Sequence, residues 1–139
     1  MRFLGTYDHT LDERGRVALP ARYRADFEDG VIITFLPEGC LALHDKATFV
    51  KQADEVAEMS ASTLDARRAR RAFMPNSLPV ELDRQGRILV PPKFRQLAGL
   101  NGAVVVVGRH ECLEIWNPER WNEELDASVV ASSAERDQG

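Results

Sequence analysis

One short motif occurs twice in this chain of 139 residues, and the repeat limits the folds that the chain can adopt. The first copy is Asp12-Glu13-Arg14-Gly15-Arg16 and the second is Asp83-Arg84-Gln85-Gly86-Arg87. The flanks repeat as well, in the pairs Leu11 and Leu82, Val17 and Ile88, Leu19 and Val90, Pro20 and Pro91, Tyr23 and Phe94, and Arg24 and Arg95. A unit this small cannot bury its hydrophobic face alone, so we expect the two copies to pack together as one structure.

Each copy carries the residues of a tight turn between two strands. Asp at the first position and Gly at the fourth suit a type I turn, and a glycine that accepts positive φ completes the common three-residue hairpin with a bulge. Alternating apolar residues predict the returning strands: Val17 and Leu19, and Ile88 and Val90. Pro20 and Pro91 end these strands, because proline cannot donate to a β-ladder, and proline fits the first turn of a short helix. Each unit is therefore expected to be strand, turn, strand and short helix.

Both turns are followed by an arginine that the turn itself does not need. A single copy is most simply a hairpin with a solvated basic tip. Two copies, with Arg16 and Arg87 at matching places, suggest two equivalent basic tips that contact a partner of periodic structure. The planar guanidinium matches guanine O6 and N7, or a phosphate, in a two-point contact. A two-stranded ribbon can also enter the major groove of DNA, and a turn fixed by glycine lowers the ordering cost of such a contact.

The composition is compatible with a globular protein that binds nucleic acid. A chain of this length is expected to form one compact domain with a substantial core. Its 44% hydrophobic and 29% charged residues are ordinary for a soluble globular protein. The net charge of −4 argues against a large basic surface. It does not exclude nucleic-acid binding, which depends on local patches, but one protomer alone should bind DNA weakly.

The rest of each half predicts further strands. Residues 1–10 should form an edge strand, and 21–27 a short helix. The β-branched run 31–35 and its partner 40–44 are matched in the second half by 103–108 and 112–116, with one extra residue between the copies.

Helices are predicted between the halves and at the end of the chain. Residues 45–71 are helical in pattern, with Asp45 as N-cap and a break near 60–63. The second of these helices carries Arg67, Arg68, Arg70 and Arg71. Such a run of charges is more simply explained as a solvated helix face than as a contact with another subunit or with phosphate. Trp121 to about Leu125 should be a short terminal helix, and residues 131–139 should be disordered.

Nothing in the sequence predicts an enzyme. The three histidines (His9, His44 and His110) and the two cysteines (Cys40 and Cys112) lack metal-ligand spacing. The cysteines are read as core positions of matching strands. No phosphate loop, nucleophile elbow or zinc-binding helix is present, and Asp12 and Asp83 already serve their turns. We therefore expect no catalytic residue, metal, cofactor or small-molecule substrate. The lack of a leader or a bilayer-spanning apolar run predicts a cytoplasmic protein with reduced thiols and no membrane partner.

The doubled pattern D-x-x-G-R-x-x-x-P-x-x-x-R closely resembles the MraZ family, a tandem version of the AbrB-like swapped-hairpin fold. The resemblance covers nearly the whole chain, from Phe3 to Trp121. It implies a mixed α/β, β-rich fold in which two tandem AbrB-like repeats form one pseudo-two-fold, β-barrel-like unit with linking and C-terminal helices. The implied parts are a first repeat (1–50), linking helices (51–72), a second repeat with a terminal helix (73–126) and a flexible tail (127–139).

The resemblance also implies a function. It indicates a bacterial transcriptional regulator at the nucleoid, binding short G-rich direct repeats upstream of its own cell-division and cell-wall operon. The protein would be a ring-shaped homo-oligomer whose tips line the surface that faces double-stranded DNA. The implied DNA-binding residues are Arg14, Arg16, Arg84, Gln85 and Arg87. The turns that hold them depend on Asp12, Gly15, Asp83 and Gly86.

The two copies are not identical, and other functions stay open. Arg14 in copy one is matched by Gln85, and Glu13 by Arg84, so the two tips need not contact DNA identically. One alternative is an antitoxin-like module whose hairpins bind a protein, although antitoxins of this type usually carry a long disordered C-terminal arm. The other is a ring-forming scaffold, which would leave the repeated arginines unexplained.

Overall fold

A computed structural model describes residues 2–58 and 60–138, and for residues 132–138 the backbone alone. Six strands form one antiparallel sheet in the order β1-β7-β8-β4-β3-β5. Their bounds are β1 (Thr6–Thr10), β3 (Val31–Phe35), β4 (Leu41–Asp45), β5 (Ser77–Val80), β7 (Ala103–Gly108) and β8 (Leu113–Trp116). Two short strands, β2 (Arg16–Ala18) and β6 (Arg87–Leu89), pair with each other in a separate ribbon. The strands predicted over 31–35 and 103–108 are confirmed, and β1 lies at an edge of the sheet as predicted.

The strand order and the register are symmetric with respect to the two halves of the chain. Exchanging β1 with β5, β3 with β7, and β4 with β8 turns the strand order of the sheet into its own reverse. The register agrees, because Val17 faces its counterpart Ile88 in the ribbon, and Ala42 faces Glu114 between the central strands. Neither half therefore completes a sheet alone, and the prediction that the two copies pack as one structure is confirmed.

The simple hairpins predicted from the turn residues do not form. On both sides of the first turn the chain pairs with the other half. β1, before the turn, runs beside β7, and β2, after the turn, pairs with β6. Val17 and Ile88 are both fully buried, so pairing β2 with β6 places two apolar faces over one core. The β-rich mixed α/β class is confirmed. The barrel-like closure was wrong, because the sheet is open with β1 and β5 at its edges.

A single large core joins the two halves on one face of the sheet. It is covered by η1 (Ala21–Phe27), a 3₁₀ helix, and α3 (Pro92–Ala98), the short helices predicted after the prolines. Phe3 packs edge-on against Tyr23 and stacks on Phe27, with ring centroids 5.1 and 5.4 Å apart. The other buried members include Leu19, Ile33, Leu41, Leu43, Val90, Phe94, Val106, Leu113 and Ile115. Because this core draws on strands from both repeats, it fixes the β2–β6 ribbon against the sheet.

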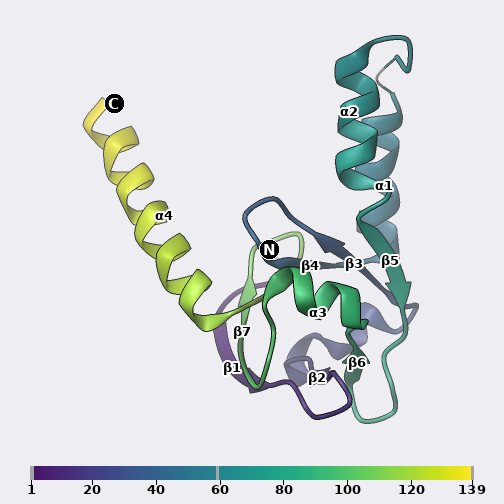
Figure 1. Cartoon of the computed structure of the whole chain (residues 1–139), viewed down its shortest axis with the longest axis vertical. Helices are drawn as coiled ribbons and strands as arrows, with labels where there is room; N and C mark the ends of the chain where they lie inside the picture. The colour runs from purple at the N-terminus through teal and green to yellow at the C-terminus, as the bar shows by residue number, and fades with distance from the viewer. Residues whose placement is uncertain (1, 59, 139) are drawn as a thin grey trace.

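The linking segment forms a helical hairpin that projects from the body of the molecule (Figure 1). It consists of α1 (Lys46–Ala57) and α2 (Leu64–Phe73), separated by the predicted break. Asp45 caps α1 as predicted, its side chain accepting a bond from the Thr48 amide, and Phe49 stacks on Phe73 with centroids 5.0 Å apart. In Figure 1 this hairpin points away from the end of the molecule that carries β2 and β6.

The terminal helix α4 (Pro118–Gln138) is longer than the short helix predicted near Leu125. Asn117 accepts bonds from the amides of Glu119 and Arg120 and so starts the helix. The residues after Leu125 include alanine, glutamate, arginine and glutamine, which favour helix, and neither proline nor glycine interrupts them before Gly139, which lies outside the described residues. The predicted disordered end is therefore helical through Gln138. In the described part of the chain, no helix is both long and apolar enough to cross a bilayer.

Candidate nucleic-acid interface

The first turn is held by a single carboxylate. Asp12 Oδ1 accepts hydrogen bonds from the backbone amides of Arg14 and Arg16, both at 2.9 Å. Its other oxygen, Oδ2, accepts from Nε of the Arg16 side chain at 2.8 Å. The backbone closes the turn through Gly15 N–H to Asp12 O at 3.0 Å and Asp12 N–H to Arg16 O at 2.9 Å. Asp12 thus shapes the turn and aims the guanidinium.

The second turn repeats this geometry bond for bond. Asp83 Oδ1 accepts from the amides of Gln85 and Arg87 at 2.8 and 2.9 Å, and Oδ2 accepts from Arg87 Nε at 3.0 Å. Gly86 N–H donates to Asp83 O at 3.0 Å, and Asp83 N–H to Arg87 O at 2.8 Å. The matching sequences therefore give matching local structures, although the residues between Asp and Gly differ.

Both turns need glycine and an ionised aspartate. Gly15 and Gly86 have φ of +84° and +77°, values that side-chain-bearing residues rarely adopt. The backbone amide of Arg16 holds the pKa of Asp12 below its usual value, and the amide of Arg87 does the same for Asp83. Both carboxylates therefore stay charged and keep their arginines fixed at neutral pH.

The β2–β6 ribbon brings the two arginines onto one surface. Val17 and Ile88 point into the core, so the alternating neighbours Arg16 and Arg87 point outward. Their side chains are 29% and 27% exposed. Arg87 Nη1 lies 4.0 Å from Asp12 Oδ2, so the second arginine reaches the carboxylate of the first turn. The two-stranded ribbon thus presents two guanidiniums together, each bound by the aspartate of its own turn.

The remaining predicted tip residues lie at the turn positions between Asp and Gly. Arg14, Arg84 and Gln85 are all exposed. The turn geometry is shared, but the first tip presents Glu13 and Arg14 where the second presents Arg84 and Gln85. The charge is therefore arranged differently at the two tips.

Two residues outside the predicted set also lie against the turns. The guanidinium of Arg24 packs on Gly86, and that of Arg95 packs on Gly15, each from the opposite repeat. The signal was visible in the sequence, since Arg24 and Arg95 occupy matching places eight residues after Arg16 and Arg87. What the sequence did not reveal is that each arginine crosses to the other copy's turn.

The arginines of α2 serve the helical hairpin. Arg67 Nη1 donates to the carbonyl of Ala61, and Arg70 Nη2 to the carbonyl of Ala57, both at 2.9 Å. Ala57 ends α1, so Arg70 caps that helix. Arg68 and Arg71 are exposed.

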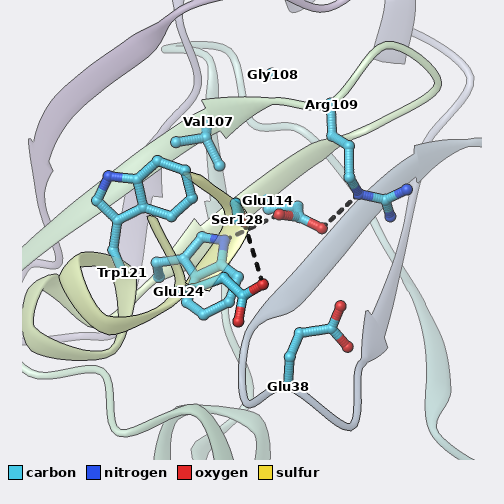
Figure 2. A pocket seen from close by; sticks show the side chains of 9 residues that line it. Glu38, Val107, Gly108, Arg109, Glu114, Trp121, Glu124 and Ser128 are labelled. Carbon is cyan, nitrogen blue, oxygen red and sulfur yellow. Dashed lines mark hydrogen bonds and ion pairs between the residues drawn. The ribbon is translucent and has the colours of Figure 1, made fainter. Parts of the chain in front are cut away.

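A separate cavity of about 200 Å³ lies between the sheet and α4. Figure 2 shows Arg109 reaching to Glu114 across its floor, with Trp121, Glu38 and Glu124 around it. Arg109 Nε donates to Glu114 Oε2 at 2.6 Å, and Trp116 Nε1 donates to Oε1 at 2.9 Å. The buried carboxylate is thus fully paired, and the arrangement supports the sheet instead of presenting a free charge to a ligand.

The cysteines lie in the core, at the matching positions the sequence predicted. Burial raises the pKa of Cys112 to about 12 and raises that of Cys40 as well, so both thiols stay protonated and weakly nucleophilic at neutral pH. Among the residues whose side chains the structure describes (2–58 and 60–131), no group of three or more His, Cys, Asp or Glu side chains could hold a metal ion.

Comparison with known proteins gives one consistent result. The model of a family described as "MraZ protein, putative antitoxin-like" matches residues 2–72 and 74–138. A protein of Thermomicrobium roseum named "Transcriptional regulator MraZ" is 42% identical over 136 residues, covering 96% of each chain. Proteins of the same name from Cutibacterium acnes and Moorella thermoacetica are 38% and 37% identical, over 93% and 87% of this chain and 91% and 85% of their own.

Proposed function

The chain belongs to the MraZ family, whose relatives are transcriptional regulators, and we propose that its two arginine-bearing tips read DNA. As a DNA-binding transcription regulator it would bind short G-rich direct repeats upstream of its own cell-division and cell-wall operon. The observation that carries this proposal is the pair of braced guanidiniums, Arg16 and Arg87, on the outward face of one ribbon.

The chemistry of the ribbon favours base contacts in the major groove. A guanidinium can donate two parallel bonds to O6 and N7 of guanine, the commonest specific contact between proteins and DNA. In each tip, Asp holds the arginine through Nε, which orients the guanidinium before DNA arrives and lowers the entropy cost of binding. Arg14 and Arg84, exposed at the turns, would contact flanking phosphates or bases, and Gln85 offers an amide that can pair with adenine.

A single two-tip unit should bind weakly, so we propose that several act together in a ring of identical subunits. The net charge of −4 gives no broad positive field to attract DNA. In a ring, each contact after the first becomes intramolecular, and avidity can exceed single-site affinity by about 10²–10⁴. This requires an operator with several repeats in one orientation and on one face of the duplex. Such a regulator would act at the nucleoid in the cytoplasm.

Binding to the upstream region tests this function and separates it from the alternatives. A labelled duplex of the chain's own upstream region and a shuffled duplex of equal composition are titrated by fluorescence anisotropy at fixed salt. The proposal predicts clear preference for the upstream region. Equal, weak binding to both duplexes would favour an antitoxin-like or scaffolding role and would contradict the proposal.

The number of repeats tests the ring. Duplexes carrying one, two, three or four direct repeats should bind with steeply rising affinity, and the salt dependence should rise with the number of phosphates neutralised. Equal affinity for one repeat and for four would show that a lone two-tip unit suffices.

A further inference from the structure

Arg24 and Arg95 lie where a side chain on the turn glycines would have to go. A Cβ on Gly86 would overlap Arg24 Nε and Cζ, and a Cβ on Gly15 would sit 2.7 Å from Arg95 Cζ and Nη1. Each guanidinium therefore packs directly on the backbone of a turn. The exchange between repeats is reciprocal: Arg24 comes from η1 of the first, and Arg95 from α3 of the second.

Backbone hydrogen bonds follow the same exchange. Leu19 N–H donates to Gly86 O at 2.9 Å, and Val90 N–H donates to Gly15 O at 2.8 Å. In the first repeat Leu19 also accepts a bond from Arg24 Nε at 3.1 Å. Leu19 thus binds the turn glycine through its N–H and the packing arginine through its carbonyl, closing a small loop across the two repeats.

We propose that Arg24 and Arg95 are positioning residues that lock each DNA-reading tip from the opposite repeat. The guanidinium of Arg24 fixes the tip containing Gly86, and that of Arg95 fixes the tip containing Gly15. The two tips thereby keep one relative position. This position sets the distance between the Arg16 and Arg87 guanidiniums where they contact the DNA. This inference rests on the proposed function of the tips and adds residues that make the reading specific.

The shapes of the guanidinium and of the glycine backbone allow this close contact. A flat guanidinium can lie over a glycine, whose missing Cβ leaves room for it, and its half-buried position limits its own motion. The two locks differ in detail, since Arg95 Nε is buried without a hydrogen-bond partner among the described residues, whereas Arg24 Nε binds Leu19. The lock on the first tip is therefore made by packing, and that on the second by packing and a hydrogen bond.

The cross-repeat contact is tested by a double-mutant cycle read by thermal unfolding. Gly86→Ala should destabilise the protein because its methyl group collides with Arg24 and its backbone is strained at positive φ. In an Arg24→Ala background the collision is gone, so adding Gly86→Ala should cost much less. In an Arg95→Ala background, which serves as the matched control, Gly86→Ala should cost its full amount. If Gly86→Ala cost the same stability in both backgrounds, the contact between Arg24 and Gly86 would be contradicted. If a Gly86 variant does not fold, Gly15→Ala repeats the test, with Arg95→Ala as the test background and Arg24→Ala as the control.

The positioning role is tested on DNA. Arg24→Ala should weaken binding to the upstream duplex by roughly tenfold, within the range of couplings between residues in contact, while binding to the shuffled duplex stays nearly unchanged. Arg24→Lys keeps the charge but lacks the flat guanidinium, so it should not restore specific binding. If Arg24→Ala instead lost affinity equally for both duplexes and Arg24→Lys bound as the wild type does, Arg24 would be a simple phosphate contact. That result would overturn the positioning role.

Failure of this inference is distinguishable from failure of the proposed function. If the wild-type chain shows no preference for the upstream duplex, the proposed function fails, while the unfolding cycle still decides the cross-repeat contact. If the wild type is specific and Arg24→Ala and Arg95→Ala bind as it does, the tips read DNA without these locks and the inference fails.

Discussion

His44 is a buried residue whose environment predicts how the stability of the protein depends on pH. It lies on β4, it is 3% exposed, and neither ring nitrogen has a hydrogen-bond partner within the part of the chain that the structure describes. Burial lowers its pKa below the usual 6.5, and the positive charge of Arg109 lowers it further, against opposing effects of Glu111 and Asp45. The folded protein therefore holds this histidine neutral.

The free energy of unfolding should consequently fall as pH is lowered from 7 to 5. Below pH 6.5 the unfolded chain binds a proton at His44 more readily than the folded chain does, so stability is lost from there down to the lowered folded pKa. Urea unfolding at several pH values measures this slope. His44→Leu should flatten it, with His110→Gln, an exposed histidine, as control. Equal slopes for His44→Leu and wild type would show that other groups set the pH dependence.

Among the elements, the helical hairpin of α1 and α2 is only weakly anchored to the core. α1 has no buried residue, and α2 buries only Ala66. The rings of Phe49 and Phe73 stack on each other between the two helices. Elements with few buried contacts open at a lower free energy than the core.

We therefore expect Phe73→Ala to loosen α1 and α2 without affecting the central strands. Losing a partly buried aromatic pair removes about 0.5–1.5 kcal/mol beyond the area it buries. Amide hydrogen exchange should quicken in residues 46–73 and stay unchanged in β4 and β8. Val50→Ala, at a side chain 54% exposed, is the matched control. Faster exchange in β4 and β8 would show that the hairpin is part of the cooperative core.

The sequence predicted the elements better than their partners. The turns were readable because Asp, Gly and Pro impose local geometry, and strands 31–35 and 103–108 were readable from their β-branched runs. The pairing of β2 with β6 was not readable from the turn residues, since turn chemistry constrains only neighbouring residues and Val17 alternates equally well in a hairpin or in an exchanged ribbon. The contacts of Arg24 and Arg95 depend on that exchange, so the sequence could mark them as repeated but could not place them.

At the scale of the whole molecule, each half uses the other to complete its sheet. Val17 faces Ile88 and Ala42 faces Glu114, which are equivalent positions of the two repeats. Two copies of the first half could form the same pairings with each other, Val17 against Val17 and Ala42 against Ala42. One copy alone would leave β2, β3 and β4 each lacking a neighbour.

A fragment of residues 1–72 should therefore fold only as a dimer. Its helical and strand content by circular dichroism should fall on dilution, and its mass by light scattering should be twice that of one fragment. The full chain, whose halves are covalently joined, should keep its two-repeat unit intact at the same dilution. A fragment that stays folded as a monomer would contradict the shared architecture.

The most direct measurement is the affinity of tip variants for the upstream duplex. Arg16→Ala and Arg87→Ala should each weaken binding by about 1–3 kcal/mol per lost base contact, and thermal stability should change little because exposed ion pairs contribute only about 0.2–1 kcal/mol. Lys51→Ala, which removes an exposed positive charge from α1, is the charge-matched control and should bind nearly as the wild type does. If the folded arginine variants bind the upstream duplex as tightly as Lys51→Ala, the two tips do not read DNA.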